Sequence, residues 1–161
     1  MASKQKNISL DHLDIRILKQ LQKDASLTVG DIAREVGMSP TPCWRRIKRM
    51  REQGIITQTV ARLDRDLLGF GFVAYAFVKL AIPSRENMEA FERLLERWPE
   101  VTLCERVTGA VDYLLKIVTT DMHAYDDFLR HRLLEVGLVS DVQSRIVLST
   151  AKDTGALPLS E

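Results

Sequence analysis

Positively charged side chains are concentrated in one short stretch of the sequence, where five of the seven residues from 45 to 51 are Arg or Lys. Among them, Cys43, Ile47 and Met50 recur at intervals of four and three residues, which is the spacing of one buried helix face. Such a helix, apolar on one side and cationic on the other, suits the major groove of DNA, where Arg donates two hydrogen bonds to guanine. A merely solvated basic surface is the alternative, and the helix signals around this stretch favour DNA contact.

The residue types within this helix suggest different roles. Arg45 and Arg49 are the best candidates for contact with base edges, whereas Ser39 and Thr41 stand at the helix start and suit phosphate. Trp44 flanks the apolar stripe, where packing against the segment that follows is favoured over DNA contact. The residues predicted to form the DNA-binding site are Ser39, Thr41, Pro42, Trp44, Arg45, Arg46, Lys48 and Arg49.

Residues that begin and end helices divide the first part of the chain into three helices. An Asp or Thr precedes each of the first two, with Asp three residues on, and glycines end the second and third. These positions are Asp11 with Asp14, Thr28 with Asp31, Gly37, Ser39 with Pro40 and Pro42 in the first turn of the third helix, and Gly54. Residues 55–63 are mostly β-branched and predict one or two strands beside the helices. The order predicts a winged helix-turn-helix.

Composition and charge exclude several other classes of protein. No apolar run is long enough for a membrane span, and none follows Met1 as a signal peptide would require, so we expect a cytoplasmic protein. Cys43 and Cys104 lack metal-ligand spacing and are expected to be buried free thiols. We expect no metal site and no cofactor. Residues 1–62 carry a net charge of +6 and residues 63–161 a net charge of −5, as a nucleic-acid-binding part on an acidic body would.

The second half of the chain alternates strand and helix patterns. Strands are expected at residues 71–82, 101–107, 113–119 and 141–149, with one helix beginning at Pro83-Ser84 and another after Asp121. The order βαββαβ predicts a four-stranded antiparallel sheet with two helices on one face, and hence an α+β protein. The apolar strands suggest that a second copy buries the other face. The expected domains are residues 1–63, a linker at 64–70, residues 71–150 and a tail at 151–161.

Three motifs in this order resemble the Lrp/AsnC family of transcriptional regulators over residues 10–150. They are the opening helix at residues 10–18, the Met38-Ser-Pro-Thr-Pro-Cys-Trp-Arg-Arg-Ile47 segment, and the Gly109-Ala-Val-Asp-Tyr113 turn. The resemblance implies a winged helix-turn-helix that binds double-stranded DNA, followed by a ferredoxin-like effector domain that forms a dimeric α+β barrel. It also implies homodimers that gather into octamers, and a small-molecule effector, usually an amino acid.

The resemblance further implies where the effector binds. The region includes the 107–113 segment and the 137–140 loop of a neighbouring subunit, with Ala110 and Leu138 standing where the family often has other residues. The implied effector residues are Val107, Thr108, Gly109, Ala110, Asp112, Tyr113, Gly137, Leu138 and Ser140. Residues 41–44 and 156–159 are similar to a branch of the family that includes regulators of cysteine breakdown, which makes cysteine one candidate effector.

The same two-domain architecture also resembles sirohaem decarboxylases, which are enzymes. That alternative needs His or Arg side chains that bind an anionic tetrapyrrole, and the histidines available are His12, His123 and His131. All three fit ordinary helix-surface positions, and the cationic helix favours DNA. The sequence therefore predicts a regulator with no catalytic residues.

Overall fold

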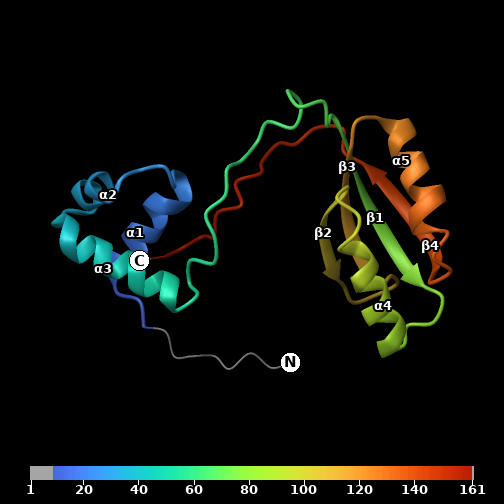
Figure 1. The fold of residues 1–161 in the computed structure, drawn as a ribbon, viewed down its shortest axis with the longest axis horizontal. Helices are drawn as coiled ribbons and strands as arrows, with labels where there is room; N and C mark the ends of the chain where they lie inside the picture. The colour runs from blue at the N-terminus through green and yellow to red at the C-terminus, as the bar shows by residue number, and fades with distance from the viewer. Residues whose placement is uncertain (1–8, 161) are drawn as a thin grey trace. The chain divides into compact units, whose positions relative to one another are not determined.

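Two units make up the chain in this computed structural model, which describes residues 9–160 (Figure 1). One contains the chain up to Ala61 and again from Lys152 onward, and the other runs from Arg62 to Ala151. The first boundary lies two residues from the predicted one. The tail, predicted to be separate, belongs to the first unit, and residues 64–70 form a turn within the second. The prediction about a signal peptide concerns residues outside the described range.

Three helices form the first unit: α1 (His12–Lys23), α2 (Val29–Val36) and α3 (Pro40–Glu52). The Asp11 carboxylate accepts from the Asp14 N–H and the Asp14 carboxylate accepts from the Asp11 N–H, which forms a reciprocal capping box at the start of α1. Thr28 caps α2 by accepting from the Asp31 N–H. Gly37 adopts a left-handed conformation with φ 75°, and the chain turns there into α3.

The core of this unit contains the apolar stripe predicted for α3. One cluster joins all three helices, and it consists of Ile17, Leu18, Ile32, Ala33, Val36, Cys43, Ile47 and Met50. The stripe prediction is confirmed. Burial of this stripe fixes which side of α3 faces outward.

The strands predicted for residues 55–63 are absent from the structure. Beyond Ile56 this segment has no regular secondary structure and is exposed. β-Branched residues favour extended backbone, but a strand also needs a partner that pairs its N–H and C=O groups, and the described chain provides none here.

Four strands and two helices form the second unit in the predicted order. They are β1 (Phe72–Leu80), α4 (Arg85–Leu95), β2 (Val101–Arg106), β3 (Tyr113–Thr119), α5 (Met122–Phe128), which continues as one π-helical turn (Leu129–Leu133), and β4 (Val139–Ile146). The spatial order is β2-β3-β1-β4, and all neighbours are antiparallel. The predicted α+β class is confirmed.

Both helices pack on one face of this sheet (Figure 1). Alternate residues of β1 and β3 point into a core with α4 and α5, and these strand residues are Ala74, Ala76, Val78, Leu80, Tyr113, Leu115 and Ile117. The opposite face carries half-buried Tyr75 and Phe77, with Arg145 5.9 Å from the Phe77 ring centroid. Apolar side chains on a face without helices are what the predicted contact with a second copy requires.

Two side chains lie differently from expectation. Cys104 is exposed rather than buried, because β2 is an edge strand that only β3 pairs. Met122 belongs to the apolar pattern at helical spacing after Asp121, which predicts an inward side chain, but it is 64% exposed at the first position of α5.

The described residues include no helix long and apolar enough to cross a membrane. Over the same residues, His, Cys, Asp and Glu side chains nowhere gather in a group that would hold a metal ion.

Candidate nucleic-acid interface and effector loops

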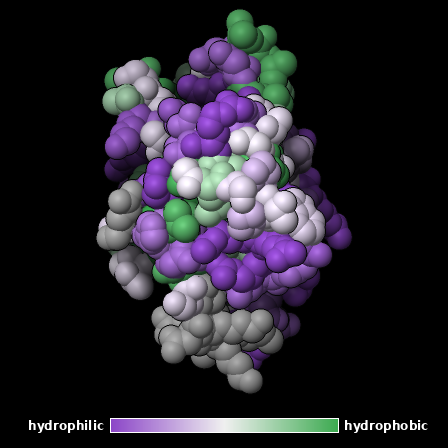
Figure 2. Space-filling model, turned by 90° about the vertical axis from the view of Figure 1, so that its left-hand side faces the viewer, coloured by the Kyte–Doolittle hydropathy of each residue, from purple (hydrophilic) through white to green (hydrophobic). Residues whose placement is uncertain are grey.

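The outward side of α3 presents most of the residues predicted to contact DNA. Thr41, Pro42, Trp44, Arg45, Lys48 and Arg49 are all exposed, and Arg46 is half-buried. Figure 2 looks onto the DNA-binding unit and shows a surface that is largely hydrophilic. Since the apolar stripe is buried, these side chains stand where a DNA groove would meet the helix.

The first turn of α3 offers few groups to a phosphate. Ser39 occupies the N-cap position, as predicted, but its side chain forms no capping hydrogen bond. Pro40 and Pro42 have no backbone N–H, so Thr41 alone among the first three helical positions has one to donate. Phosphate contact here would depend on the Ser39 and Thr41 hydroxyls rather than on a row of backbone amides.

Two of the predicted DNA-contact residues form ion pairs with α1. The Arg46 guanidinium lies 2.6 Å from Asp11 Oδ2 and 2.8 Å from Asp14 Oδ1, and Arg49 lies 2.5 Å from Asp14 Oδ2. The side chain of Asp14 is only 1% exposed, so both arginines compensate a buried negative charge. The Asp14 N–H and the Arg46 side chain together lower the pKa of Asp11. We call this group the α1–α3 ion cluster.

The sequence pattern identifies Asp11 and Asp14 only as capping residues and does not reveal the α1–α3 ion cluster. The position of Asp14 was a usable signal, because it lies in the first turn of α1 beside the apolar face of that helix. A carboxylate buried there needs a cation as a partner. Arg46 is 25% exposed and serves mainly to hold α3 against α1. Arg49 remains 44% exposed while one of its nitrogens bonds Asp14.

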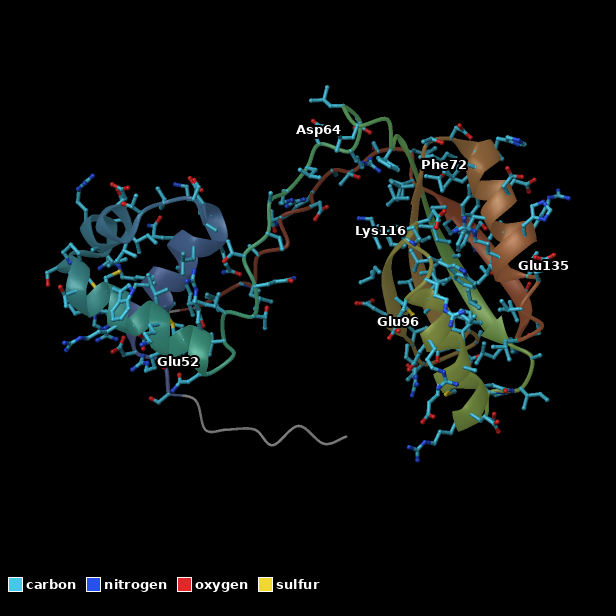
Figure 3. All side chains as sticks on the ribbon, in the orientation of Figure 1. Glu52, Asp64, Phe72, Glu96, Lys116 and Glu135 are labelled. Carbon is cyan, nitrogen blue, oxygen red and sulfur yellow. The ribbon has the colours of Figure 1, made fainter. Side chains whose placement is uncertain are left out.

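Arg45 and Lys48 lie on the open side of α3. Within residues 9–160 Arg45 has no ion-pair partner, whereas Lys48 Nζ lies 3.8 Å from Glu52 and 5.2 Å from the Trp44 ring centroid. Figure 3 marks Glu52 at the end of the helix. Trp44 is half exposed and borders a hollow of about 290 Å³ that residues of all three helices line.

The predicted effector turn at residues 107–112 is fastened to the end of β1. The Val107 N–H donates to the Asp112 carbonyl at 3.0 Å, and the Asp112 N–H donates to the Val78 carbonyl at 2.9 Å. The Asp112 carboxylate accepts from the Leu80 N–H at 2.8 Å. Thr108, Gly109 and Ala110 are thereby left exposed at the tip, where Gly109 has φ 118°.

The second predicted effector loop, residues 137–140, is fastened to the same strand end. The Leu138 carbonyl accepts from the Ala81 N–H at 2.8 Å. The Ser140 hydroxyl lies 3.2 Å from the carbonyl oxygens of both Lys79 and Leu80. The two loops therefore flank one strand end within a single chain.

Tyr113 is the one predicted effector residue that faces away from this loop surface. It is fully buried against Phe91, with ring centroids 4.9 Å apart, and its hydroxyl donates to Glu92 at 2.9 Å. Arg106 donates to the same carboxylate oxygen and lowers the pKa of Glu92, while burial raises the pKa of Tyr113 to about 12. The side chain supports the turn from beneath.

Comparison with known proteins matches both units to families. Residues 10–57 match a winged helix-turn-helix DNA-binding domain, and residues 73–157 match the Lrp/AsnC ligand-binding domain. The chain belongs to the Lrp/AsnC family.

Individual Lrp/AsnC relatives match over nearly their whole length. The transcriptional regulator AzlB of Bacillus subtilis is 36% identical over 154 residues, which cover 96% of this chain and 98% of AzlB. The transcriptional activator DecR of Escherichia coli is 35% identical over 150 residues, which cover 93% of this chain and 99% of DecR. The solved structure of a Neisseria meningitidis regulator in complex with L-methionine superposes with a TM-score of 0.90 at 37% identity, covering 93% of this chain and 97% of that one.

This Lrp/AsnC protein is a DNA-binding transcriptional regulator whose second domain binds a ligand, and it is not an enzyme. The sirohaem decarboxylase alternative is therefore wrong. The three histidines that it required are all exposed, and His123 lies 3.8 Å from Asp127 one turn along α5.

Proposed function

We propose that an amino acid binds at the two loops fastened to the end of β1 and thereby alters DNA binding or assembly. The observation that carries this proposal is that Asp112 and Ser140 hold both loops against the same short stretch of main chain. A ligand at the loop tips would change contacts that reach the central strand of the sheet. The proposed contacts are Val107, Thr108, Gly109, Ala110 and Asp112 with Gly137, Leu138 and Ser140, while Tyr113 supports them from below.

The choice of effector is best tested among the amino acids, starting with two. L-Methionine is bound in the similar Neisseria regulator, and cysteine follows from the resemblance of residues 41–44 and 156–159 to regulators of cysteine breakdown. Melting temperatures measured with each of the twenty amino acids should rise for the effector, because a ligand of the folded state stabilises by mass action.

A loop-tip variant and its control make this test specific. Thr108→Trp would fill the space above the turn and should abolish the rise in melting temperature, whereas Thr150→Trp, another exposed threonine of the same unit, should leave it intact. An equal rise in both variants would place the ligand elsewhere. No rise with any amino acid would reject this class of effector.

For the DNA contacts we propose that Arg45 reads a base edge and that Lys48 contacts phosphate. Arg49 is a second base-reading candidate, because its bond to Asp14 orients a guanidinium that is still partly exposed. Ser39, Thr41, Pro42 and Trp44 would line the groove around them. Arg46 would act by holding α3 in place.

Two substitutions separate these roles. Arg45→Ala should weaken specific binding by roughly 1–3 kcal/mol and leave random DNA nearly unaffected. Lys48→Ala should weaken both and reduce the slope of log K against log salt by about one. Arg34→Ala, an exposed arginine on α2, is the charge-matched control. Equal losses on both DNAs for Arg45→Ala would show that this residue meets only phosphate.

We further propose that the protein acts in the cytoplasm as a homodimer, joined through the sheet face that lacks helices, and that dimers assemble into octamers. Tyr75 and Phe77 support this choice of interface, because both are aromatic and both are only half-buried on this face of the sheet. A two-fold dimer should bind a near-palindrome with half-sites one helical turn, or a multiple of it, apart. Light scattering should show that Phe77→Glu shifts the protein to monomers; unchanged oligomers would place the interface elsewhere.

A further inference from the structure

Gln22, near the end of α1, binds the main chain of the C-terminal tail. Its side-chain oxygen accepts from the Leu157 N–H at 2.7 Å, and its side-chain nitrogen donates to the Leu157 carbonyl at 3.3 Å. One amide side chain thus pairs with both polar groups of a single residue that is 135 positions away in the sequence. Such pairing recognises extended backbone independently of the side chain on it.

Pro158 shapes the tail directly after this contact. The Leu159 N–H donates back to the Leu157 carbonyl at 2.9 Å, which closes a three-residue turn with Pro158 at its centre. An inverse γ-turn needs φ near −75° at its central residue, and the proline ring holds φ close to that value. The turn directs two leucines differently: Leu157 is 69% exposed, whereas Leu159 is partly buried against the core of the DNA-binding unit.

We propose that residues 156–159 are a docking peptide that binds the α1 face at Gln22 of the same chain. The polypeptide leaves the DNA-binding unit after Ala61 and returns to it at Lys152. Docking therefore connects the DNA-binding unit to the effector unit a second time, by the tail in addition to the segment that follows Ala61. We call these interactions of Gln22, Leu157 and Leu159 the tail contact.

The tail contact is small, and its strength depends on being intramolecular. Two hydrogen bonds and one partly buried leucine would bind a separate peptide weakly. Because the tail and α1 belong to the same chain, the contact needs far less binding energy than the same contact with a separate peptide would. Loss of the buried leucine should therefore release the tail, although the rest of the fold stays intact.

Hydrogen exchange in the full-length protein tests the contact without reference to DNA. Leu159→Ala should speed hydrogen exchange of the tail amides, including the Leu157 N–H, by roughly five- to tenfold. This is the factor by which burial of part of a leucine side chain favours the docked tail. Leu157→Ala is the matched control, because the same substitution two residues away removes a mostly exposed side chain. Equal exchange rates in the two variants would overturn the proposal, and unchanged melting of both units would show that folding is not the cause of any difference.

A disulfide trap tests whether the tail docks on its own chain. Gln22→Cys with Leu157→Cys, in a Cys104→Ser background that removes the exposed native thiol, should oxidise to a bridge within one chain. On a non-reducing gel this species runs as a monomer. Covalent dimers, which would place the tail on a second copy, would overturn the proposal.

The effect on DNA rests on the proposed function and is measured separately. With one connection released, the recognition helices of a dimer should tolerate a wider range of half-site separations. Leu159→Ala should reduce the preference for the best separation over one shifted by half a helical turn, and Leu157→Ala should not. If the exchange and trapping results hold but this preference is unchanged, the tail contact stands and its influence on DNA spacing is rejected.

Discussion

Replacement of Asp14 by Asn should destabilise the DNA-binding unit more than any change at its surface. The buried carboxylate accepts from the Asp11 N–H at 3.2 Å, from Arg46 at 2.8 Å and from Arg49 at 2.5 Å. Asn keeps one acceptor oxygen and turns an NH₂ group toward a guanidinium, so at least one charge-assisted hydrogen bond is lost and the other weakens. Such bonds contribute about 1.5–3 kcal/mol each, and water can replace part of the Arg49 interaction. The expected loss in the free energy of unfolding is therefore about 3 kcal/mol.

The two tryptophans allow this loss to be measured in one unit alone. Trp44 is in the DNA-binding unit and Trp98 in the effector unit, so Trp98→Phe leaves a fluorescence signal that reports only α3. For a unit of this size, about 3 kcal/mol lowers the melting temperature by more than about 10 °C. Glu35→Gln, which changes an exposed acidic residue of α2, should leave the transition in place. Melting of Asp14→Asn within about 2 °C of the parent would refute the reasoning that the α1–α3 ion cluster stabilises this fold.

Three further outcomes are expected in the effector unit. Because burial raises the pKa of Tyr113 to about 12, its contribution to stability is complete below pH 10 and is lost as the pH rises toward 12; Trp98 fluorescence should report this alkaline loss, and Tyr113→Phe should remove it. Because Arg106 lowers the pKa of Glu92, the ion pair of these two residues stabilises the fold above the ordinary carboxyl range, and this stabilisation is lost as the pH falls through the lowered pKa. Glu92→Gln should therefore make the free energy of unfolding less dependent on acid pH. Gly109→Ala should lower the free energy of unfolding by about 1–2 kcal/mol, because residues with a side chain rarely adopt its φ of 118°. Chemical denaturation measures this loss, and an equal loss for Gly71→Ala, a glycine without such a φ, would contradict the reasoning.

Features that depend on neighbouring residues were predictable from the sequence. The caps at Asp11 and Thr28, the stripe of α3 and the order of the strands all follow from local spacing, and the structure has them. Contacts between distant elements were not predictable in the same way. The pairing of Arg46 with Asp14 depends on how α1 crosses α3, which spacing along either helix does not specify.

The remaining differences have similar causes. The strands expected at residues 55–63 required a partner that composition does not reveal. Tyr113 belongs by sequence to the effector turn, but strand alternation directs its side chain toward α4 instead. The docking of Leu159 joins two ends of the chain, and no periodicity of the sequence records it.

Because the DNA-binding unit is discontinuous in the chain, the order of synthesis matters for this protein. Its three helices leave the ribosome first, and domains generally fold in that order. The contacts that Leu157 and Leu159 add to α1 form only after residues 62–151 have been translated. A truncated product that lacks the last residues would carry a recognition helix without its second connection. Translation itself therefore delays the complete DNA-binding unit until the effector domain, which senses the ligand, has been made.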